Sequence, residues 1–331
     1  MDEDLVFETV WYNEFTKELT QDVEGKVFVI SGTTSGTGYV AARTAAEKGG
    51  EVILLNRASE RATNALAKLK KEVPTGNFVP IECDLQSFDS VRKAAAELIS
   101  KYTDDGIYCV CWNAGIMATP DKATVDGYDD QMQTNHLSHF LLTAKLYPLL
   151  EKYANAHGDA RIVNHSSGGR HMTPNGCLER KYFEKNGGNL GGSETGNVGM
   201  SGAPFLRYFQ TKLANAVFTK ALHQKLQAKT SKVKAICADP GMSATSLSDH
   251  MGSQVEIMKA YADKYQTAED GAMGIIKGMM HPDAESGVHY GPAGTKGPAI
   301  RNEPKPYELD PEAMKMLWEV SKISTGVVFE I

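Results

Sequence analysis

The sequence lacks any long hydrophobic run and any cluster of basic residues. None of its segments approaches the ~18–20 consecutive apolar residues that a membrane-spanning helix needs, so no transmembrane segment is predicted. The net charge is −6 over 331 residues, which argues against nucleic-acid binding. The beginning of the chain, MDEDLVFETVWYNEF, is acidic and has no apolar core, so it does not look like a secretory signal.

Cysteine is also scarce, with five residues in the chain. Four of them stand in apolar, strand-like runs, and no pair has the Cys-x-x-Cys spacing of a redox or zinc motif. We therefore predict reduced cysteines, no disulfide framework, no metal site and an intracellular, cytoplasmic location. The five residues are Cys83, Cys109, Cys111, Cys177 and Cys237.

A glycine-rich turn follows the first apolar run of the chain. Residues 26–31 (KVFVIS) predict a buried parallel strand, and YVAARTAAEKG after the turn predicts a helix. Gly32 permits a tight turn, Gly36 lets a pyrophosphate approach the backbone, and Gly38 lets the helix pack against the strand. The helix N-terminus would face the phosphates, so the GxxxGxG pattern indicates a dinucleotide site.

The second predicted strand, residues 51–55, has no acidic residue at its end. A cofactor without a ribose 2′-phosphate is normally held there by Asp or Glu. Asn56 and Arg57 stand at this point instead, with Arg61 one turn later. Arg57 could pair with a 2′-phosphate, so the sequence favours NADP(H) over NAD(H). The alternative is that both arginines are solvated residues at the start of a surface helix.

Strands and helices alternate along the chain, which is typical of a doubly wound parallel sheet. Small or polar residues follow several strands, at the edge where ligands bind in such sheets. We predict an α/β fold of Rossmann type in a single domain. Further strands are expected over residues 77–83, 107–112, 161–167, 232–238 and 288–290, and a long helix over about 128–153.

The predicted organisation is an N-terminal arm (1–24), a nucleotide-binding domain (25–295) and a C-terminal tail (296–331). Phe7, Trp11 and Phe15 would pack the arm on the domain. Within the domain, the Gly-rich insertion 168–205 is either a flexible surface loop or a loop over the substrate mouth. The amphipathic, Met-rich stretch 243–265 is interpreted as a substrate lid, with ordinary core as the alternative.

Tyr208 and Lys212 lie in a stretch without Pro or Gly that predicts a helix. Of the 13 tyrosines, only Tyr208 has a lysine four residues on. Positions i and i+4 share a helix face, so the ammonium group would lower the pKa of the phenol from its usual ~10. The phenol could then exchange a proton near neutral pH. The plain alternative is an amphipathic helix in which the pair has no role.

The ordered set of motifs resembles the short-chain dehydrogenase/reductase family over about residues 25–295, and within it the retinol-dehydrogenase-like branch. The motifs that carry the resemblance are Ser31-Gly32-xxx-Gly36-x-Gly38, Asp84-Leu85, Asn113-Ala114-Gly115, Asn135, Ser167, Tyr208-xxx-Lys212 and Pro240-Gly241-xxx-Thr245.

The resemblance implies a catalytic set of four residues. Tyr208 would exchange a proton with the substrate oxygen, while Lys212 would lower the pKa of that phenol and bond the nicotinamide ribose. Ser167, rather than its neighbour Ser166, would polarise the carbonyl group. Asn135 would hold a water molecule that links Lys212 to solvent.

The resemblance also implies the contacts of the cofactor. Asp84 would meet the adenine, Asn113 to Gly115 would line its ribose, and Met242 and Thr245 would contact the carboxamide. The full set is Gly32, Thr34, Ser35, Gly36, Thr37, Gly38, Asn56, Arg57, Asp84, Leu85, Asn113, Ala114, Gly115, Tyr208, Lys212, Pro240, Gly241, Met242 and Thr245.

The predicted function is an NADP(H)-dependent oxidoreductase that reduces a carbonyl, or oxidises the alcohol, of a fairly apolar small molecule. A non-catalytic NADP(H)-sensing protein and a reductase of a conjugated C=C bond stay open as alternatives. The 40 residues between Ser167 and Tyr208 exceed the usual gap of the family, which leaves the substrate open. A homodimer through the helices near residues 128 and 205 is an option that the insertion could block.

Overall fold

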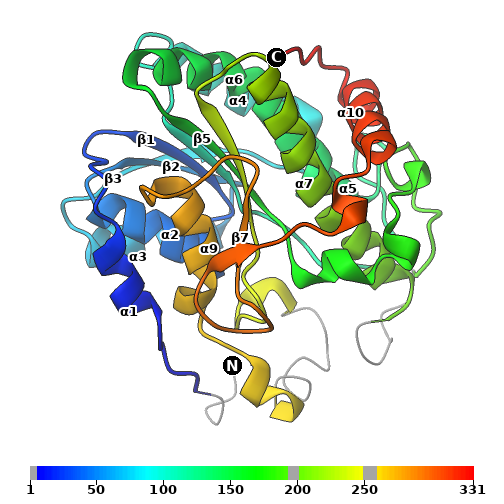
Figure 1. The fold of residues 1–331 in the computed structure, drawn as a ribbon, viewed down its shortest axis with the longest axis horizontal. Helices are drawn as coiled ribbons and strands as arrows, with labels where there is room; N and C mark the ends of the chain where they lie inside the picture. The colour runs from blue at the N-terminus through cyan, green and yellow to red at the C-terminus, as the bar shows by residue number, and fades with distance from the viewer. Residues whose placement is uncertain (1–5, 193–200, 249–258) are drawn as a thin grey trace.

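The computed structural model describes residues 6–192, 201–248 and 259–331. One eight-stranded sheet in the order β3-β2-β1-β4-β5-β6-β7-β8 forms its centre (Figure 1). Strands β1 to β7 pair in parallel, and β8 is antiparallel to β7. The strands are β1 (Val27–Ser31), β2 (Glu51–Asn56), β3 (Asn77–Glu82), β4 (Cys109–Trp112), β5 (Ala160–His165), β6 (Val233–Ala238), β7 (His289–Gly291) and β8 (Ile300–Asn302).

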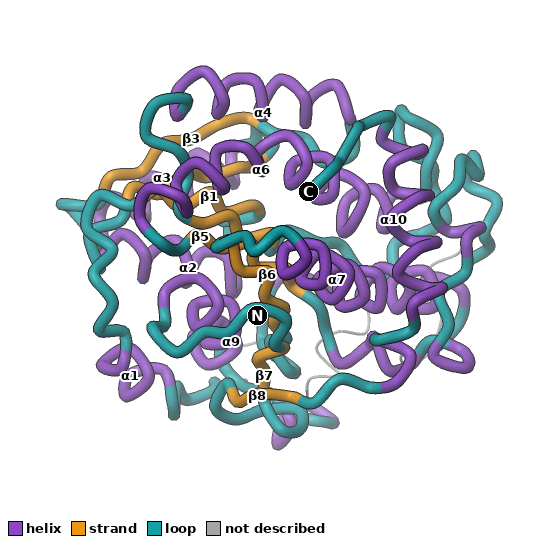
Figure 2. Tube along the Cα trace, turned by 45° about the horizontal axis from the view of Figure 1, so that its top comes forward, coloured by secondary structure: helices purple, strands orange, loops and turns teal. Residues whose placement is uncertain are grey.

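Helices cover both faces of the sheet (Figure 2). Consecutive side chains of β1 enter opposite cores: Phe28 and Ile30 pack with α2, α3 and α9, whereas Val27 and Val29 pack with α4, α6 and α7. This explains why the strands read as continuous apolar runs. The helices are α2 (Gly36–Glu47), α3 (Glu60–Glu72), α4 (Phe88–Tyr102), α6 (Ser138–His157), α7 (Ala203–Ala228), α9 (Ala268–Met280) and α10 (Pro311–Thr325).

The doubly wound α/β fold predicted from the sequence is confirmed, and so are its seven parallel strands. The eighth strand was not predicted, because Ile300–Asn302 is short and largely exposed and so carries no apolar pattern. The four cysteines expected inside the protein are buried, and Cys177 is exposed.

The N-terminal arm packs on the domain, where its contact is with α9, and it does so through hydrogen bonds as well as aromatic rings. The Asp270 carboxylate accepts the main-chain N–H groups of Val10, Trp11 and Tyr12, each at 2.9 Å. These are the donors at the start of α1 (Tyr12–Phe15), which a helix leaves without internal partners. Phe15 is buried beneath them.

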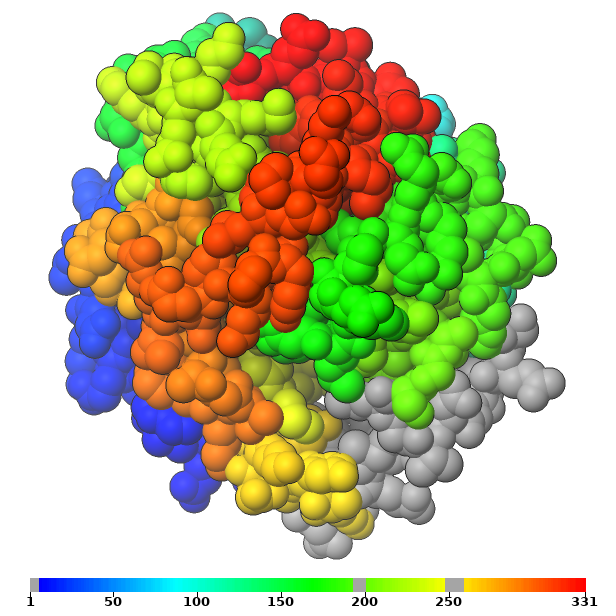
Figure 3. All heavy atoms as spheres, turned by 45° about the vertical axis from the view of Figure 1, so that its right-hand side comes forward, coloured from blue at the N-terminus to red at the C-terminus, as the bar shows by residue number. Residues whose placement is uncertain are grey.

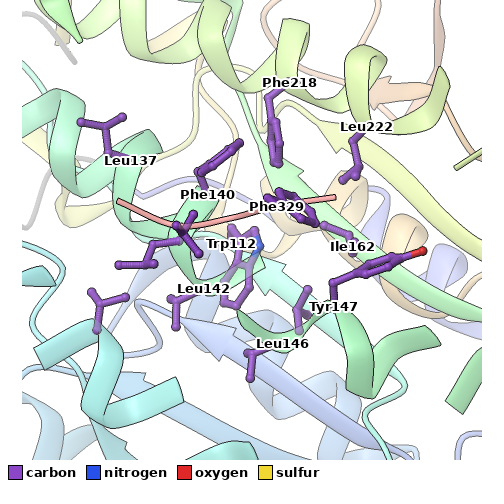
Figure 4. Close-up of a cluster of buried hydrophobic side chains, with 14 of the residues drawn as sticks. Trp112, Leu137, Phe140, Leu142, Leu146, Tyr147, Ile162, Phe218, Leu222 and Phe329 are labelled. Carbon is purple, nitrogen blue, oxygen red and sulfur yellow. The ribbon is translucent and has the colours of Figure 1, made fainter. Parts of the chain in front are cut away.

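The C-terminal tail is part of the main core. Helix α10 lies on α7 and α6, and Trp318 stacks on Phe329 with ring centroids 4.9 Å apart. Phe329 also meets Phe140 of α6 edge-on at 5.6 Å, within the cluster drawn in Figure 4. The last residues therefore cover the outer side of the α6 and α7 pair.

Parts of the two predicted substrate-covering stretches lie outside the described residues. These are residues 193–200 of the Gly-rich insertion and 249–258 of the Met-rich stretch, including Met251, Val255 and Met258. Within the described ranges, no helix is long and apolar enough to cross a membrane.

Candidate active site

The glycine-rich turn lies where the strand order reverses, between β1 and β4. Gly32 and Gly36 have φ values of 72° and 59°, which favour glycine. The side chain of Ser35 makes no capping bond at the start of α2. A Cβ on Gly38 would lie 2.2 Å from Nδ2 of Asn113, so this position admits no side chain.

Asn113 holds this turn from the end of β4. Its Nδ2 donates to the carbonyls of Ser31 and Gly32 at 3.1 and 3.0 Å, and its Oδ1 accepts from the Thr37 hydroxyl at 2.8 Å. The Asn113 side chain is therefore committed to the protein interior, and only its main chain could line a ribose. The side chain of Thr37 is likewise turned inward.

Residues at and after the end of β2 contact the glycine-rich turn. Asn56 is used by the turn, since its Oδ1 accepts the Thr33 N–H at 2.9 Å and its Nδ2 donates to the Thr33 hydroxyl at 2.8 Å. Arg57 is exposed, whereas Arg61 donates a hydrogen bond to the Ser35 hydroxyl. A cavity of about 610 Å³ opens beside this contact. It is lined by the glycine-rich turn and by α2, α3 and α9, with residues that include Thr34, Ser35, Gly36, Arg43, Arg61 and Lys68.

The sequence alone did not show that Arg61 reaches the glycine-rich turn. Its place in the first turn of α3 brings it towards the end of β1. The available signal was that two arginines, Arg57 and Arg61, follow β2 where an acidic residue would otherwise stand.

The motifs after β3 and β6 lie at the same edge of the sheet. Oδ1 of Asp84 accepts the Gln86 N–H at 2.9 Å, and the Leu85 carbonyl accepts the Ser138 hydroxyl at 2.6 Å. Thr245 lies against the glycine-rich turn, because a Cβ on Gly36 would be 3.1 Å from its side chain.

The Pro240-Gly241 turn after β6 is fixed by main-chain contacts. The Met242 N–H donates to Thr295 at 2.6 Å, and the Met242 carbonyl accepts from Gln266 at 2.9 Å. This turn and Thr245 are thus held beside the end of β1, as a shared ligand site requires.

Asn135 belongs to a π-helical turn (Gln133–Leu137) between the short helix α5 (Asp130–Met132) and α6. Such turns occur often at functional sites. The side chain of Asn135 brackets Ile116, accepting its N–H at 2.8 Å and donating to its carbonyl at 2.9 Å, and it also donates to the Thr211 hydroxyl at 2.9 Å. All its side-chain groups therefore have protein partners.

The two serines after β5 face different ways. Ser166 is buried and donates its hydroxyl to the Lys212 carbonyl at 2.7 Å. Ser167 is partly exposed, and its hydroxyl accepts the Gly169 N–H at 3.2 Å and bonds Tyr208. The geometry favours Ser167 over Ser166 as the group that meets a substrate.

Tyr208 and Lys212 lie on one face of α7, with Nζ of Lys212 5.5 Å from the centre of the Tyr208 ring. Burial raises the pKa of Tyr208, while its hydrogen bond with Ser167 opposes that rise. The prediction that the pKa of this phenol would be lowered is therefore wrong for the protein without a bound cofactor. The reason is that Phe205 and Phe209 bury the phenol in an apolar cluster.

Lys212 is buried at the centre of the site. Burial lowers its pKa to about 8, against the opposing influence of Asp239. A Cβ on Gly115 would lie 3.5 Å from Nζ of Lys212 and 3.2 Å from Oδ1 of Asn135. Glycine at this position leaves space beside the ammonium group, where a flat ring could enter. In the described parts of the chain, no cluster of three or more His, Cys, Asp or Glu side chains is arranged to hold a metal ion.

Comparison with known proteins decides the family. Residues 26–177 match the short chain dehydrogenase model. The chain is also 30% identical over 317 residues to a short-chain dehydrogenase/reductase of Penicillium roqueforti, covering 91% of this chain and 85% of the relative. The chain belongs to the short-chain dehydrogenase/reductase family. It is therefore an oxidoreductase, and its substrate is a small molecule.

Two further matches extend along nearly the whole chain. Human polyprenol dehydrogenase is 28% identical over 310 residues, covering 92% of this chain and 86% of that protein. A solved structure from Mycobacterium paratuberculosis has a TM-score of 0.71 at 26% identity, covering 98% of this chain and 100% of the other. The retinol-dehydrogenase-like branch predicted from the sequence is not singled out by these matches and stays a prediction.

Proposed function

We propose that this protein is an NADP(H)-dependent reductase of carbonyl groups on apolar small molecules, or in reverse an alcohol dehydrogenase. The observation that carries the proposal is the meeting of Tyr208, Ser167 and Lys212 beside the gap left by Gly115. A buried phenol with a raised pKa keeps its proton at neutral pH. That is the protonation state needed to donate to a carbonyl oxygen.

The turn after β1 fits the diphosphate of a dinucleotide. The first turn of α2 has no side-chain cap, so its N–H groups are suited to an anion. Arg61 at Ser35, with Arg57 four residues before it, supplies positive charge where a 2′-phosphate would lie. When bound, the nicotinamide supplies the hydride that reduces the carbonyl carbon.

The protein's own residues would manage the proton and the charge. Tyr208 donates its phenolic proton to the carbonyl oxygen as that oxygen gains negative charge, and Ser167 bonds the same oxygen. Lys212 is mostly protonated at pH 7, since its pKa is about 8, and its positive charge stabilises the phenolate left behind. In the direction of oxidation, the phenolate takes the alcohol proton.

Apolar side chains around the phenol support an apolar substrate. Phe205 and Phe209 pack on Tyr208, with Met117 and Ala118 beside them. The name of the human relative, polyprenol dehydrogenase, points to an alcohol of the same character.

A panel of aldehydes and ketones assayed for NADPH consumption tests the proposal. We expect turnover by the wild type and a loss of ~10²–10⁴-fold in kcat for Tyr208→Phe, with Tm unchanged. Tyr147→Phe is the matched control, since that phenol is also buried and bonds Glu151 at 2.9 Å, on α6. Full turnover by Tyr208→Phe would overturn the proposed mechanism. Product analysis separates reduction of C=O from reduction of C=C.

A further inference from the structure

Arg170 connects three segments of the chain, one of which contains Ser167. It is 5% exposed and lies in the 3-10 turn Gly168–Met172 that follows β5. Its Nη1 donates to the Ser167 carbonyl at 3.0 Å and to Oδ2 of Asp239 at 2.5 Å, and its Nε donates to Oε1 of Glu308 at 2.9 Å. One guanidinium group thus joins the second residue after β5, the first residue after β6 and the C-terminal tail.

Glu308 brings the tail to this edge of the sheet. It is 2% exposed, and its second oxygen accepts the Lys305 N–H at 3.1 Å. The neighbouring Tyr307 bonds Nδ1 of His171 at 2.5 Å, and its ring covers Gly176, where a Cβ would lie 2.4 Å from the ring. Figure 3 shows the tail, in orange-red, against the green segment that follows β5.

Asp239 places a negative charge beside the turn that follows Ser167, since a Cβ on Gly168 would lie 3.9 Å from its Oδ2. Its Oδ1 accepts the Gly241 N–H at 2.8 Å, so it also fixes the Pro240-Gly241 turn. Burial lowers the pKa of Lys212 and raises that of Tyr208. The charge of Asp239 favours the protonated form of both groups, so it opposes the first shift and adds to the second. Asp239 itself is held by Arg170, so the strength of this influence depends on the guanidinium group.

We propose that Arg170 is a positioning residue of the reductase site, which holds the Ser167 main chain and compensates the charge of Asp239, and that Glu308 makes the tail part of this site. The inference rests on the proposed function. Buried charged side chains are costly to desolvate, and proteins in which hydrophobic residues replace them are often as stable. A positioning role therefore explains this cluster better than a contribution to stability does. The tail would then be needed for turnover as well as for folding.

Several other titratable groups lie near this cluster. His289 and His165 are buried, which lowers the pKa of both imidazoles and keeps them neutral at pH 7. The groups that face Arg170 are Asp239, Cys237, Glu308, Tyr307, His171 and His289, and those that face Lys212 are Asp239, Cys237, His139, His165 and Tyr208. Asp239 is the carboxylate common to both sets.

The pH profile of kcat/KM separates the proposed role from a merely structural one. The probe is 4-nitrobenzaldehyde with NADPH, and the proteins are the wild type, Arg170→Met and Arg170→Met/Asp239→Asn. In Arg170→Met the charge of Asp239 is no longer compensated, so it should hold protons more firmly on the nearby groups. The pH at which kcat/KM falls on the alkaline side, the alkaline limb of the profile, should then rise by about one unit, and kcat should fall about tenfold. Removing the carboxylate in the double variant should move the limb back, while kcat stays low.

Arg170→Lys keeps the charge and loses the planar fork. It should therefore leave the limb in place and lower kcat, and it serves if Arg170→Met does not fold. The inference would be overturned if the alkaline fall of kcat/KM stayed at its wild-type pH in Arg170→Met, or if it stayed at the shifted pH in the double variant. A wild type without turnover would instead refute the proposed function.

Glu308→Ala tests the tail, with Glu303→Ala as its control. Glu303 is in the same tail, and its side chain is 82% exposed. Glu308→Ala should lower kcat about tenfold while the KM for NADPH stays within twofold, and Glu303→Ala should match the wild type. Equal kcat values for both variants would remove the tail from the site.

Discussion

Nζ of Lys212 donates a 3.1 Å hydrogen bond to the main-chain carbonyl of His165, the last residue of β5. The same carbonyl accepts a second bond, at 3.0 Å, from Nδ2 of Asn215. The ammonium group is therefore placed by a strand end and by its own helix.

Burial of Lys212 should make stability depend on pH. Its pKa of about 8 in the folded protein lies below the unfolded value of 10.5, so between these values the unfolded chain binds more protons. The free energy of unfolding that this group contributes then rises with pH across that window, by roughly 3 kcal/mol. Urea titrations of the wild type and Lys212→Met near pH 7.5 and pH 10, without cofactor, measure the difference. Parallel pH dependence of the two proteins would refute the lowered pKa.

Asn215 should be needed to fix the main chain of the site at Asn135 and His165. Its Nδ2 also donates to the Asn135 carbonyl at 3.1 Å, and its Oδ1 accepts from Nδ1 of His136 at 3.2 Å. Nε2 of His136 then accepts from the Ser321 hydroxyl at 2.9 Å. Asn215→Leu leaves buried partners unpaired, so it should cost about 2 kcal/mol in urea unfolding and lower kcat at least tenfold. A variant with wild-type kcat would show that these carbonyls need no such support.

Arg61 should discriminate between the two nicotinamide cofactors. Arg61→Ala should weaken NADP⁺ binding roughly 10–100-fold and leave NAD⁺ binding unchanged, because a charge-assisted bond is worth ~1.5–3 kcal/mol. Thermal shift or calorimetry with both nucleotides measures this, beside Arg57→Ala. Arg301→Ala is the surface control, since Arg301 pairs with Glu285 far from the turn. Equal losses for NADP⁺ and NAD⁺ would place Arg61 outside the 2′-phosphate site.

Gly32 should tolerate a side chain much less well than Gly25. Both have positive φ, 72° and 68°, so alanine pays a similar backbone cost of ~1–2 kcal/mol at each. A Cβ on Gly32 would lie 2.7 Å from Cα of Ala114, whereas one on Gly25 would meet nothing within 4 Å. Gly32→Ala should therefore lose NADP⁺ stabilisation and more stability than Gly25→Ala. Similar melting curves and nucleotide shifts for the two variants would contradict this packing.

The chain should be a monomer of 36.0 kDa in solution. The homodimer considered from the sequence would pair the helices near residues 128 and 205, but α10 and Phe329 cover the outer side of α6 and α7. Light scattering coupled to gel filtration measures the mass. If a dimer is found and Trp318→Asp leaves it intact, the dimer uses another surface. If Trp318→Asp abolishes it, the dimer forms through the α6, α7 and α10 side of the protein.

The fold was predictable because its signals are local. Central strands such as β1 and β5 are buried on both faces and so read as apolar runs, and the turns after β1 and β4 carry their glycine or small residues close to those runs. The spacing of Tyr208 and Lys212 likewise fixed their common helix face. Such features depend only on neighbours along the chain.

The remaining features depend on residues far apart in the sequence. Phe205 and Phe209 stand beside Tyr208 in the sequence, but Met117 and Ala118, which complete the apolar cluster around the phenol, come from about 90 residues earlier. The sequence near Tyr208 therefore does not show the burial that raises the pKa of this phenol. Nothing near Arg170 shows that it would meet Glu308, 138 residues later. The orientation of the Asn113 side chain could not be predicted either, because an amide that follows a strand can point either to a ligand or to the glycine-rich turn.

The ends of the sheet bear on how the protein behaves at high concentration. An exposed edge strand offers unpaired N–H and C=O groups to other molecules and so promotes aggregation. Here β3, at one end, contains Pro80, which has no N–H, and β8, at the other, has only three residues with Arg301 in the middle. Both ends are thus poor templates for a further strand, which should protect the concentrated protein from edge-to-edge association.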